Sequence, residues 1–131
     1  MKRKHPLGSQ VILDLEYATK EELLNRTPRQ WLHLLKKAAV AAGAHVIKST
    51  YHVFREKDDC NEPGGITAVV ILEESHITIH TWTKEREAHI DIFTCGDKCK
   101  PWVGAKYIIE QTKPIKVNGK KRFKRGGKYD F

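Results

Sequence analysis

The stretch EESHITIH, residues 73–80, places carboxylates, a hydroxyl and two imidazoles at the end of the most apolar run of the chain, GGITAVVILEESHITIH. A serine, a histidine and a later cysteine are residue types that serve nucleophilic and acid–base chemistry. Ser75 lacks the surrounding GxSxG pattern of an ordinary serine hydrolase. The residues therefore permit nucleophilic chemistry, but not of the common hydrolase kind.

The same residues permit two other interpretations. In the first, the histidines are surface or interface residues of a half-exposed strand. In the second, His76 and His80 join Cys95 and Cys99 around zinc, because three residues separate each pair and two imidazoles with two thiolates suit a tetrahedral site. Structural zinc usually uses tighter cysteine pairs on turns, so this pattern is a weak indication of a metal.

The direction of the side chains limits the site further. Alternation along an unbroken strand puts His76, Thr78, His80 and Trp82 on one face, and Ser75, Ile77, Ile79 and Thr81 on the other. Ser75 and His80 would then point apart. Chemistry that joins these two residues requires a bend at residues 74–76.

Apolar periodicity predicts the elements that must position these residues. Strands are expected at 10–17, 45–54, 66–73, 76–82, 88–95 and 114–117, and helices at 27–44 and 100–112. The first helix has Thr27 as its N-cap, Pro28 at its first position and Gly43 as its terminator.

Two local signals and the order of elements complete the expected fold. Thr19 with Glu22 three residues on resembles a second capping box, and Asn118–Gly119 is a turn signal that would end the last strand. Three of the four strands expected between the helices are joined by short connections, so much of the sheet should be antiparallel. The expected fold class is α+β: a two-layer sandwich with two helices over one face of the sheet, in the order strand, helix, strands, helix, strand.

Length and charge indicate one domain, residues 1–131, whose basicity lies near its end. The formal charge is +8, and residues 116–131, with seven Lys or Arg and one Asp, carry +6 of it. A uniformly basic face would suggest nucleic acid, whereas a short terminal run such as KKRFKRGGK is more typical of a solvated arm. A basic RNA-binding module is therefore a remote alternative.

Hydropathy and cysteine content indicate the compartment. No segment approaches the roughly 20 apolar residues that span a bilayer, and the start MKRKHPLGSQ lacks the apolar stretch of a secretory signal. Cysteine is scarce and odd in number, at Cys60, Cys95 and Cys99, which suits a reducing compartment. We expect a cytoplasmic protein with no membrane partner.

Several motifs in the correct order resemble the S-adenosylmethionine decarboxylase family of the short prokaryotic type. ESHITIHTW followed by HIDIFTCG resembles the ESH, HTW and FTCG motifs of that family. STYHVF resembles its STFHRF-like strand, and PGGITAVVI resembles its Gly-rich lead into the ESH strand. The resemblance extends from about residue 9 to residue 112, and leaves out the N-terminus, the loop 56–63 and the basic tail.

The resemblance implies a proenzyme that cuts its own backbone between Glu74 and Ser75. The β chain would comprise residues 1–74. The α chain, residues 75–131, would begin with a covalent pyruvoyl group derived from Ser75, which forms a Schiff base with the substrate amine and draws electrons during decarboxylation.

The resemblance also implies the roles of other side chains. His80 would be the proton acceptor in processing, and Cys95 would be the proton donor in decarboxylation. The implied substrate-binding residues are Phe54, Thr67, Trp82 and Glu85. Cys60 and Cys99 match no family function.

The substrate implied by the family is S-adenosylmethionine, in polyamine (spermidine) biosynthesis. Three positions depart from the family pattern: Thr83 and Lys84 stand where Pro and a ribose-binding Glu are usual, and Leu15 stands where an aromatic residue helps to sandwich the adenine. A lysine cannot accept hydrogen bonds from ribose hydroxyls, although Glu85 is one residue away. Arginine or ornithine is therefore the alternative substrate on the same scaffold.

The resemblance further implies a homodimer of αβ units with two active sites near the interface. It implies no metal and no cofactor other than the pyruvoyl group. Nucleic acid is not an expected partner.

Overall fold

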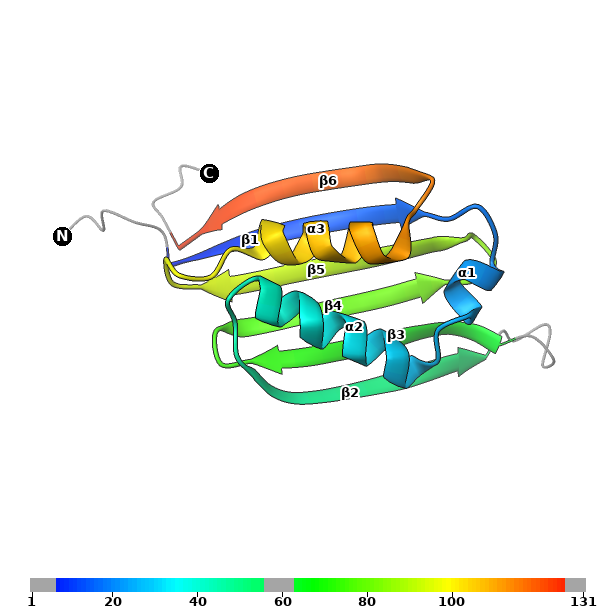
Figure 1. Ribbon diagram of the computed structural model, residues 1–131, viewed down its shortest axis with the longest axis horizontal. Helices are drawn as coiled ribbons and strands as arrows, with labels where there is room; N and C mark the ends of the chain where they lie inside the picture. The colour runs from blue at the N-terminus through cyan, green and yellow to red at the C-terminus, as the bar shows by residue number, and fades with distance from the viewer. Residues whose placement is uncertain (1–6, 56–62, 127–131) are drawn as a thin grey trace.

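The computed structural model describes residues 7–55 and 63–126. Its elements are β1 (Gly8–Glu16), α1 (Glu21–Leu24), α2 (Pro28–Ala41), β2 (Val46–Arg55), β3 (Pro63–Leu72), β4 (Ser75–Trp82), β5 (Glu87–Cys95), α3 (Pro101–Thr112) and β6 (Lys116–Arg125). The six strands form one sheet in the order β2-β3-β4-β5-β1-β6, with every neighbouring pair antiparallel. Figure 1 shows the helices on one face of the sheet. The predicted α+β two-layer sandwich is confirmed.

The alternation along each strand separates a buried face from an open one. In β4, Ile77 and Ile79 are buried under the helices, whereas His76, Thr78 and His80 are half-buried on the opposite face. We call this second face, with His76, Thr78, His80 and Trp82 of β4, the open face. No described helix covers it, so its side chains are available to form a site.

Helix α2 begins as the sequence predicts. The Gln30 N–H donates to the Thr27 hydroxyl at 3.2 Å, and the Thr27 N–H donates to the Gln30 side chain at 2.8 Å. These two bonds satisfy backbone donors at the helix start that would otherwise lack partners. Pro28 occupies the first turn, and Gly43 beyond the helix has a φ of +84°, which favours glycine.

The capping box expected at Thr19 and Glu22 is wrong. The short helix α1 has Lys20 as its N-cap residue, and no side chain caps it. The helix starts at Glu21, one residue later than the Thr19 pattern requires.

The turn expected at Asn118–Gly119 is also wrong. Strand β6 continues to Arg125, and the pairing with β1 shifts by one residue between Asp14 and Leu15, opposite Asn118. A β-bulge has formed instead of a turn, because pairing with β1 on both sides of Asn118 outweighs the local preference of Asn-Gly.

Much of the predicted basic arm is therefore part of the sheet. Arg122 lies over the Trp102 ring, 5.1 Å from its centroid, and Arg125 lies over the Phe93 ring at 5.3 Å. Lysine and arginine along an outer strand are a common protection against edge-to-edge association of sheets. The part of the arm at residues 127–131, like Cys60, lies outside the described residues. Within the described ranges, no helix has the length and apolar content needed to cross a membrane.

Candidate active site

The peptide bond between Glu74 and Ser75 lies in the tight turn from β3 to β4. Leu72 pairs directly with Ser75, so only Glu73 and Glu74 connect the two strands. Ser75 has a φ of +150°, a value that residues other than glycine rarely adopt. Such a conformation costs about 1–3 kcal/mol and persists only where surrounding contacts enforce it. The backbone is thus strained at the predicted cleavage position.

Strand β5 holds the other side of this peptide bond. The Cys95 N–H donates to the Glu74 carbonyl oxygen at 2.8 Å. The Cys95 side chain is exposed, and its neighbour Thr94 is the direct partner of Ser75 in the β4–β5 ladder. The structure therefore brings together the predicted nucleophile, the carbonyl it would attack and the predicted proton donor.

His80 lies at the opposite end of β4 among aromatic side chains. Its ring centroid is 5.4 Å from that of Phe54 and 4.3 Å from that of Trp82, and Thr67 Oγ1 lies 2.7 Å from its Nδ1. Burial, and secondarily the nearby His89, lower the pKa of His80. The imidazole is therefore held in its neutral form at pH 7, as a proton acceptor requires.

Two neighbouring hollows on the open face share His80. One, of about 340 Å³, is lined by Phe54, Gly64, Gly65, His80, Thr81, Trp82, Thr83 and Glu85; the other, of about 320 Å³, is lined by Ile12, Thr67, Thr78, Ile79, His80, His89, Ile90 and Asp91. A Cβ added to Gly65 would lie 1.6 Å from the Thr81 carbonyl oxygen, so glycine is required in this wall. The four predicted substrate-binding residues thus lie around His80.

The two groups of site residues are far apart within one chain. Ser75 and His80 belong to the same unbroken strand, and five residues of extended chain span about 16 Å. The expected bend lies before Ser75, in the turn 73–74, and does not fold His80 back toward Ser75. One chain alone does not bring this nucleophile and this base together.

Three residues of the site were missed by sequence reasoning. The Trp82 indole N–H donates to His89 Nδ1 at 3.1 Å, and Asp91 Oδ2 lies 3.4 Å from His76 Nε2. Thr94 is fully buried, and within the described residues its hydroxyl has no hydrogen-bond partner. The alternation HIDIF signals that His89 and Asp91 share a face, but the register of β4 against β5 was needed to identify their neighbours.

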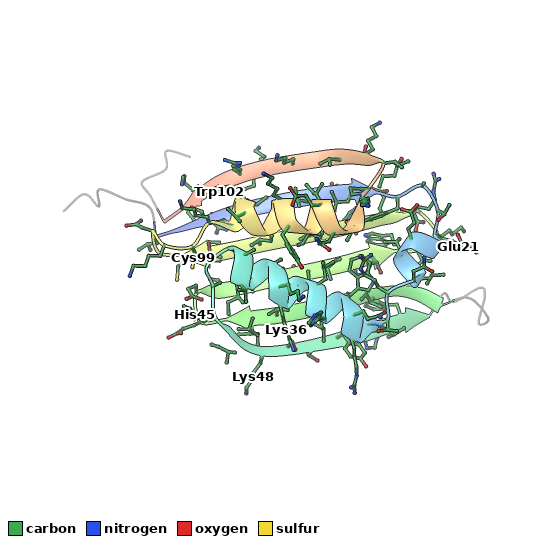
Figure 2. The ribbon with its side chains drawn as sticks, viewed as in Figure 1. Glu21, Lys36, His45, Lys48, Cys99 and Trp102 are labelled. Atoms are coloured by element: carbon green, nitrogen blue, oxygen red, sulfur yellow. The ribbon has the colours of Figure 1, made fainter. Side chains whose placement is uncertain are left out.

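The zinc interpretation is not supported. Cys99 is buried just before α3 (Figure 2), where its Sγ donates to the Gly43 carbonyl oxygen at 3.4 Å. His76 and His80 lie on the open face of β4. Among the described residues these four side chains form no cluster close enough to hold one ion.

The positions that raised doubt about the substrate have simple structural explanations. Leu15 is fully buried among the core residues beneath the helices, so its predicted place beside an adenine ring is wrong. Lys84 is exposed in the turn after β4, whereas Glu85 lines the hollow with Phe54 and Trp82. Glu85 is therefore the carboxylate available to a ligand there.

Comparisons with known proteins identify the family of this chain. The family described as S-adenosylmethionine decarboxylase matches residues 9–126. The S-adenosylmethionine decarboxylase proenzyme of Caldicellulosiruptor saccharolyticus is 38% identical over 109 residues, covering 83% of this chain and 81% of that one. The proenzyme of the same name from a Hydrogenobaculum species is 38% identical over 120 residues, covering 92% and 82%.

A solved structure shows the same fold. The crystal structure of the adenosylmethionine decarboxylase from Aquifex aeolicus superposes with a TM-score of 0.78 at 31% identity, covering 97% of each chain. None of these comparisons favours an arginine or ornithine decarboxylase. The family match over most of the chain, the identity to its relatives and the shared fold lead to one conclusion: this chain belongs to the S-adenosylmethionine decarboxylase family.

Proposed function

We propose that the chain is a proenzyme that cleaves itself between Glu74 and Ser75, and then acts as a pyruvoyl-dependent S-adenosylmethionine decarboxylase. The observation that carries this proposal is the geometry of the cleavage peptide. Ser75 has a strained φ of +150°, and the Glu74 carbonyl accepts a hydrogen bond from the Cys95 N–H.

This geometry supports attack by the Ser75 hydroxyl. As its Oγ bonds to the Glu74 carbonyl carbon, negative charge develops on the carbonyl oxygen, and the Cys95 N–H already donates to that oxygen. The Ser75 hydroxyl proton passes to the Ser75 nitrogen as the C–N bond breaks, which transfers the Glu74 acyl group to Oγ and leaves that nitrogen as an amine. The strain at Ser75 favours this step, because cleavage frees the backbone from the rare φ.

Processing is completed by elimination from the resulting ester. A base removes the Ser75 Cα proton, and the Cα electrons expel Oγ as part of the new Glu74 carboxylate. The dehydroalanine that remains loses its nitrogen as ammonia by hydrolysis, which gives the terminal ketone. Neutral His80 is the base that best suits this step, and its lowered pKa keeps it available at pH 7.

The residues at this position fit a pyruvoyl group. The group would stand at the start of β4, beside the exposed Cys95 thiol, and would supply an electron sink for the electrons released with carbon dioxide. The thiol is well placed to return a proton to the substrate α-carbon.

The hollow beside His80 supports recognition of the adenosyl part of the substrate. The rings of Phe54 and Trp82 offer apolar and cation-binding faces, and S-adenosylmethionine carries both a base and a sulfonium cation. The Glu85 carboxylate accepts hydrogen bonds from hydroxyls. These features suit S-adenosylmethionine better than arginine, which has no ribose and no purine.

A homodimer follows from the separation of Ser75 from His80. If the open faces of two chains meet with their β4 strands antiparallel, the Ser75 end of one strand lies beside the His80 end of the other. Apolar side chains on the open face, including Ile12, Phe54 and Ile71, are between 38% and 43% exposed in the single chain. Their burial between two copies would stabilise such a dimer.

Intact mass and denaturing electrophoresis of freshly made protein test the proposal. Wild type should yield fragments 1–74 and 75–131 and release carbon dioxide from S-adenosylmethionine, whereas Ser75→Ala should remain one inactive chain. A single uncut, fully active wild-type chain would contradict self-processing. Turnover of arginine or ornithine, without turnover of S-adenosylmethionine, would contradict the substrate assignment.

A further inference from the structure

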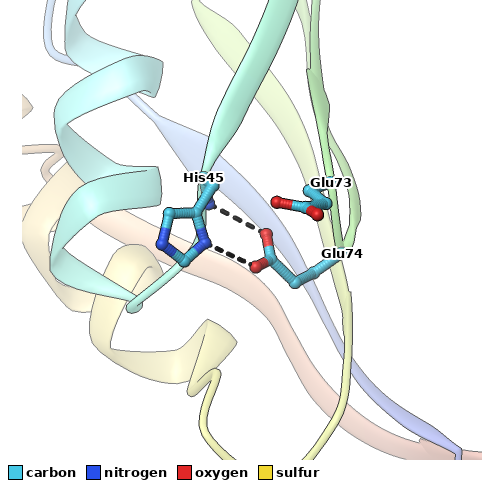
Figure 3. Close-up of side chains that lie close together, drawn as sticks. All are labelled: His45, Glu73 and Glu74. Atoms are coloured by element: carbon cyan, nitrogen blue, oxygen red, sulfur yellow. Dashed lines mark hydrogen bonds and ion pairs between the residues drawn. The ribbon is translucent and has the colours of Figure 1, made fainter.

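The turn that carries the cleavage carbonyl is tied to His45, the residue before β2 (Figure 3). The Glu73 N–H donates to the His45 carbonyl oxygen at 2.9 Å, and the His45 N–H donates to Glu74 Oε1 at 2.8 Å. The His45 Nδ1 lies 2.7 Å from Glu74 Oε2. Three hydrogen bonds therefore join one residue to both residues of the turn.

The His45 and Glu74 side chains meet in the geometry of an ion pair, with Nδ1 2.7 Å from Oε2, although the His45 side chain is 73% exposed. Its hydrogen bond to the Glu74 side chain raises the pKa of His45, and the same bond lowers the pKa of Glu74. Both shifts favour imidazolium facing carboxylate. Although Glu73 completes a group of three side chains that could surround a cation, both Glu74 carboxylate oxygens are already bonded to His45.

Glu74 is thus held at two points on opposite sides of the cleavage peptide. Its side chain is fixed by His45, and its carbonyl oxygen is fixed by the Cys95 N–H at 2.8 Å. These two contacts and the pairing of Ser75 with Leu72 together restrain the backbone, so the φ of Ser75 has little freedom to relax. The Cys95 contact is a single hydrogen bond, so the two His45 contacts add a second restraint on Glu74.

We propose that His45 is a positioning residue for self-cleavage: by gripping the Glu74 side chain, it keeps the Glu74 carbonyl on the Cys95 N–H and within the strained turn that Ser75 attacks. The inference rests on the proposed cleavage at Glu74–Ser75. His45 takes no proton from a reacting atom. Its loss should slow the conversion of the precursor while leaving the cleavage position unchanged.

Cell-free synthesis followed by intact mass at timed intervals measures this conversion directly. His45→Ala should slow cleavage roughly tenfold, since small misplacements of reacting groups cost rate steeply. His45→Asn, whose amide N–H can stand in for Nδ1–H, should restore the rate to within about threefold of wild type. His33→Ala, which removes an exposed histidine of α2, is the matched control and should process at the wild-type rate.

A double-mutant cycle separates positioning from general support of the fold. If His45 acts through Glu74, His45→Ala should have no further effect in a Glu74→Ala background, because the two changes remove the same contact. Melting of the uncleaved Ser75→Ala precursor, with and without His45→Ala, reports stability independently. A further slowing by His45→Ala in the Glu74→Ala background, together with a lower melting temperature, would overturn the inference.

The remaining outcomes distinguish this inference from the function on which it rests. If wild type splits and His45→Ala splits equally fast, the positioning role is wrong and self-processing stands. If wild type never splits, the proposed function itself fails.

Discussion

The two ends of strand β4 differ in what they contribute to the chemistry. At its first residue, Ser75 has a strained backbone, and the Cys95 N–H holds the Glu74 carbonyl. Near its last residue, His80 is half-buried among aromatic rings in a hollow of about 340 Å³. In the proposed function, one end offers the bond to be broken, and the other offers a base and a place for a nucleoside.

This difference shows why neither end is a complete active site. Extended chain of five residues keeps the ends about 16 Å apart, and no loop movement shortens a strand paired on both sides. Two antiparallel copies of β4 bring unlike ends together. The separation therefore predicts an active site shared by two chains, each contributing one end.

The largest effect is expected from mixing two inactive variants, which should restore both cleavage and decarboxylation. Ser75→Ala cannot form the cofactor, and His80→Ala should stall before elimination. In a mixed dimer, the Ser75→Ala chain supplies His80 to the intact Ser75 of its partner, so the His80→Ala chain should be cut and decarboxylation should appear. Intact mass identifies which chain was cut, because the two precursors differ in mass.

The control for this experiment places both changes in one chain. Mixing His80→Ala with the double variant Ser75→Ala/His80→Ala should give neither cleavage nor activity, because neither chain supplies His80. If His80→Ala alone completes cleavage as a homodimer, His80 is not the base. If the mixture stays uncut although mixed dimers form, the shared site is wrong.

Removing the Cys95 thiol should separate the two stages of the reaction. Cys95→Ala keeps the backbone N–H that binds the Glu74 carbonyl, so cleavage should continue at least in part. Turnover should fall about 100-fold, within the range for losing a general acid. Protonation at the wrong carbon would leave the substrate amino group on the cofactor, and mass spectrometry of the α chain should detect this. Wild-type turnover would show that another group donates the proton.

The sequence predicts those features of the fold that depend on neighbouring residues, and it fails for those that depend on residues far apart in the chain. The alternation in HITIHTW and the pattern Thr27-Pro28 are local, and they correctly predicted β4 and the start of α2. The local turn signal Asn118–Gly119 was wrong, because pairing of the ten-residue strand β6 with β1 on both sides of Asn118 overrides a two-residue preference. Register is a long-range property, and sequence periodicity does not define it.

The same limit applies to the candidate site. The family motifs identified Ser75, His80 and Cys95, but they did not indicate that Ser75 and His80 lie at opposite ends of a straight strand. The approach of His45 to Glu74 joins segments 29 positions apart in sequence. No spacing rule within a single element indicates such a contact.

The loss of processing at acid pH tests the His80 end. Burial and the nearby His89 lower the pKa of His80, so neutral imidazole persists to a lower pH than for an ordinary histidine. The cleavage rate should fall about tenfold per pH unit below this pKa, because protonation removes the base. His89→Gln should move the fall toward higher pH, since one of the two causes that lower the pKa of His80 is lost. A profile that His89→Gln does not change would contradict this explanation, with exposed His33→Gln as the control.

The smallest effect is expected at the Ser75 end, from the buried hydroxyl of Thr94. Thr94 pairs with Ser75 across β4 and β5, and within the described residues its Oγ1 has no hydrogen-bond partner. A buried hydroxyl without a partner costs about 1–3 kcal/mol, so Thr94→Val should leave the melting temperature of the Ser75→Ala precursor equal or higher.

If the hydroxyl is kept for the reaction at Ser75, Thr94→Val should nevertheless slow cleavage a few-fold, and Thr94→Ser should not. Stability and rate would then change in opposite directions, which a packing defect does not produce, because a poorly packed core lowers the melting temperature. Cleavage of Thr94→Val at the wild-type rate would show that the hydroxyl has no part in processing. The strained backbone and the Cys95 N–H would then be the features that set the Ser75 end apart from the His80 end.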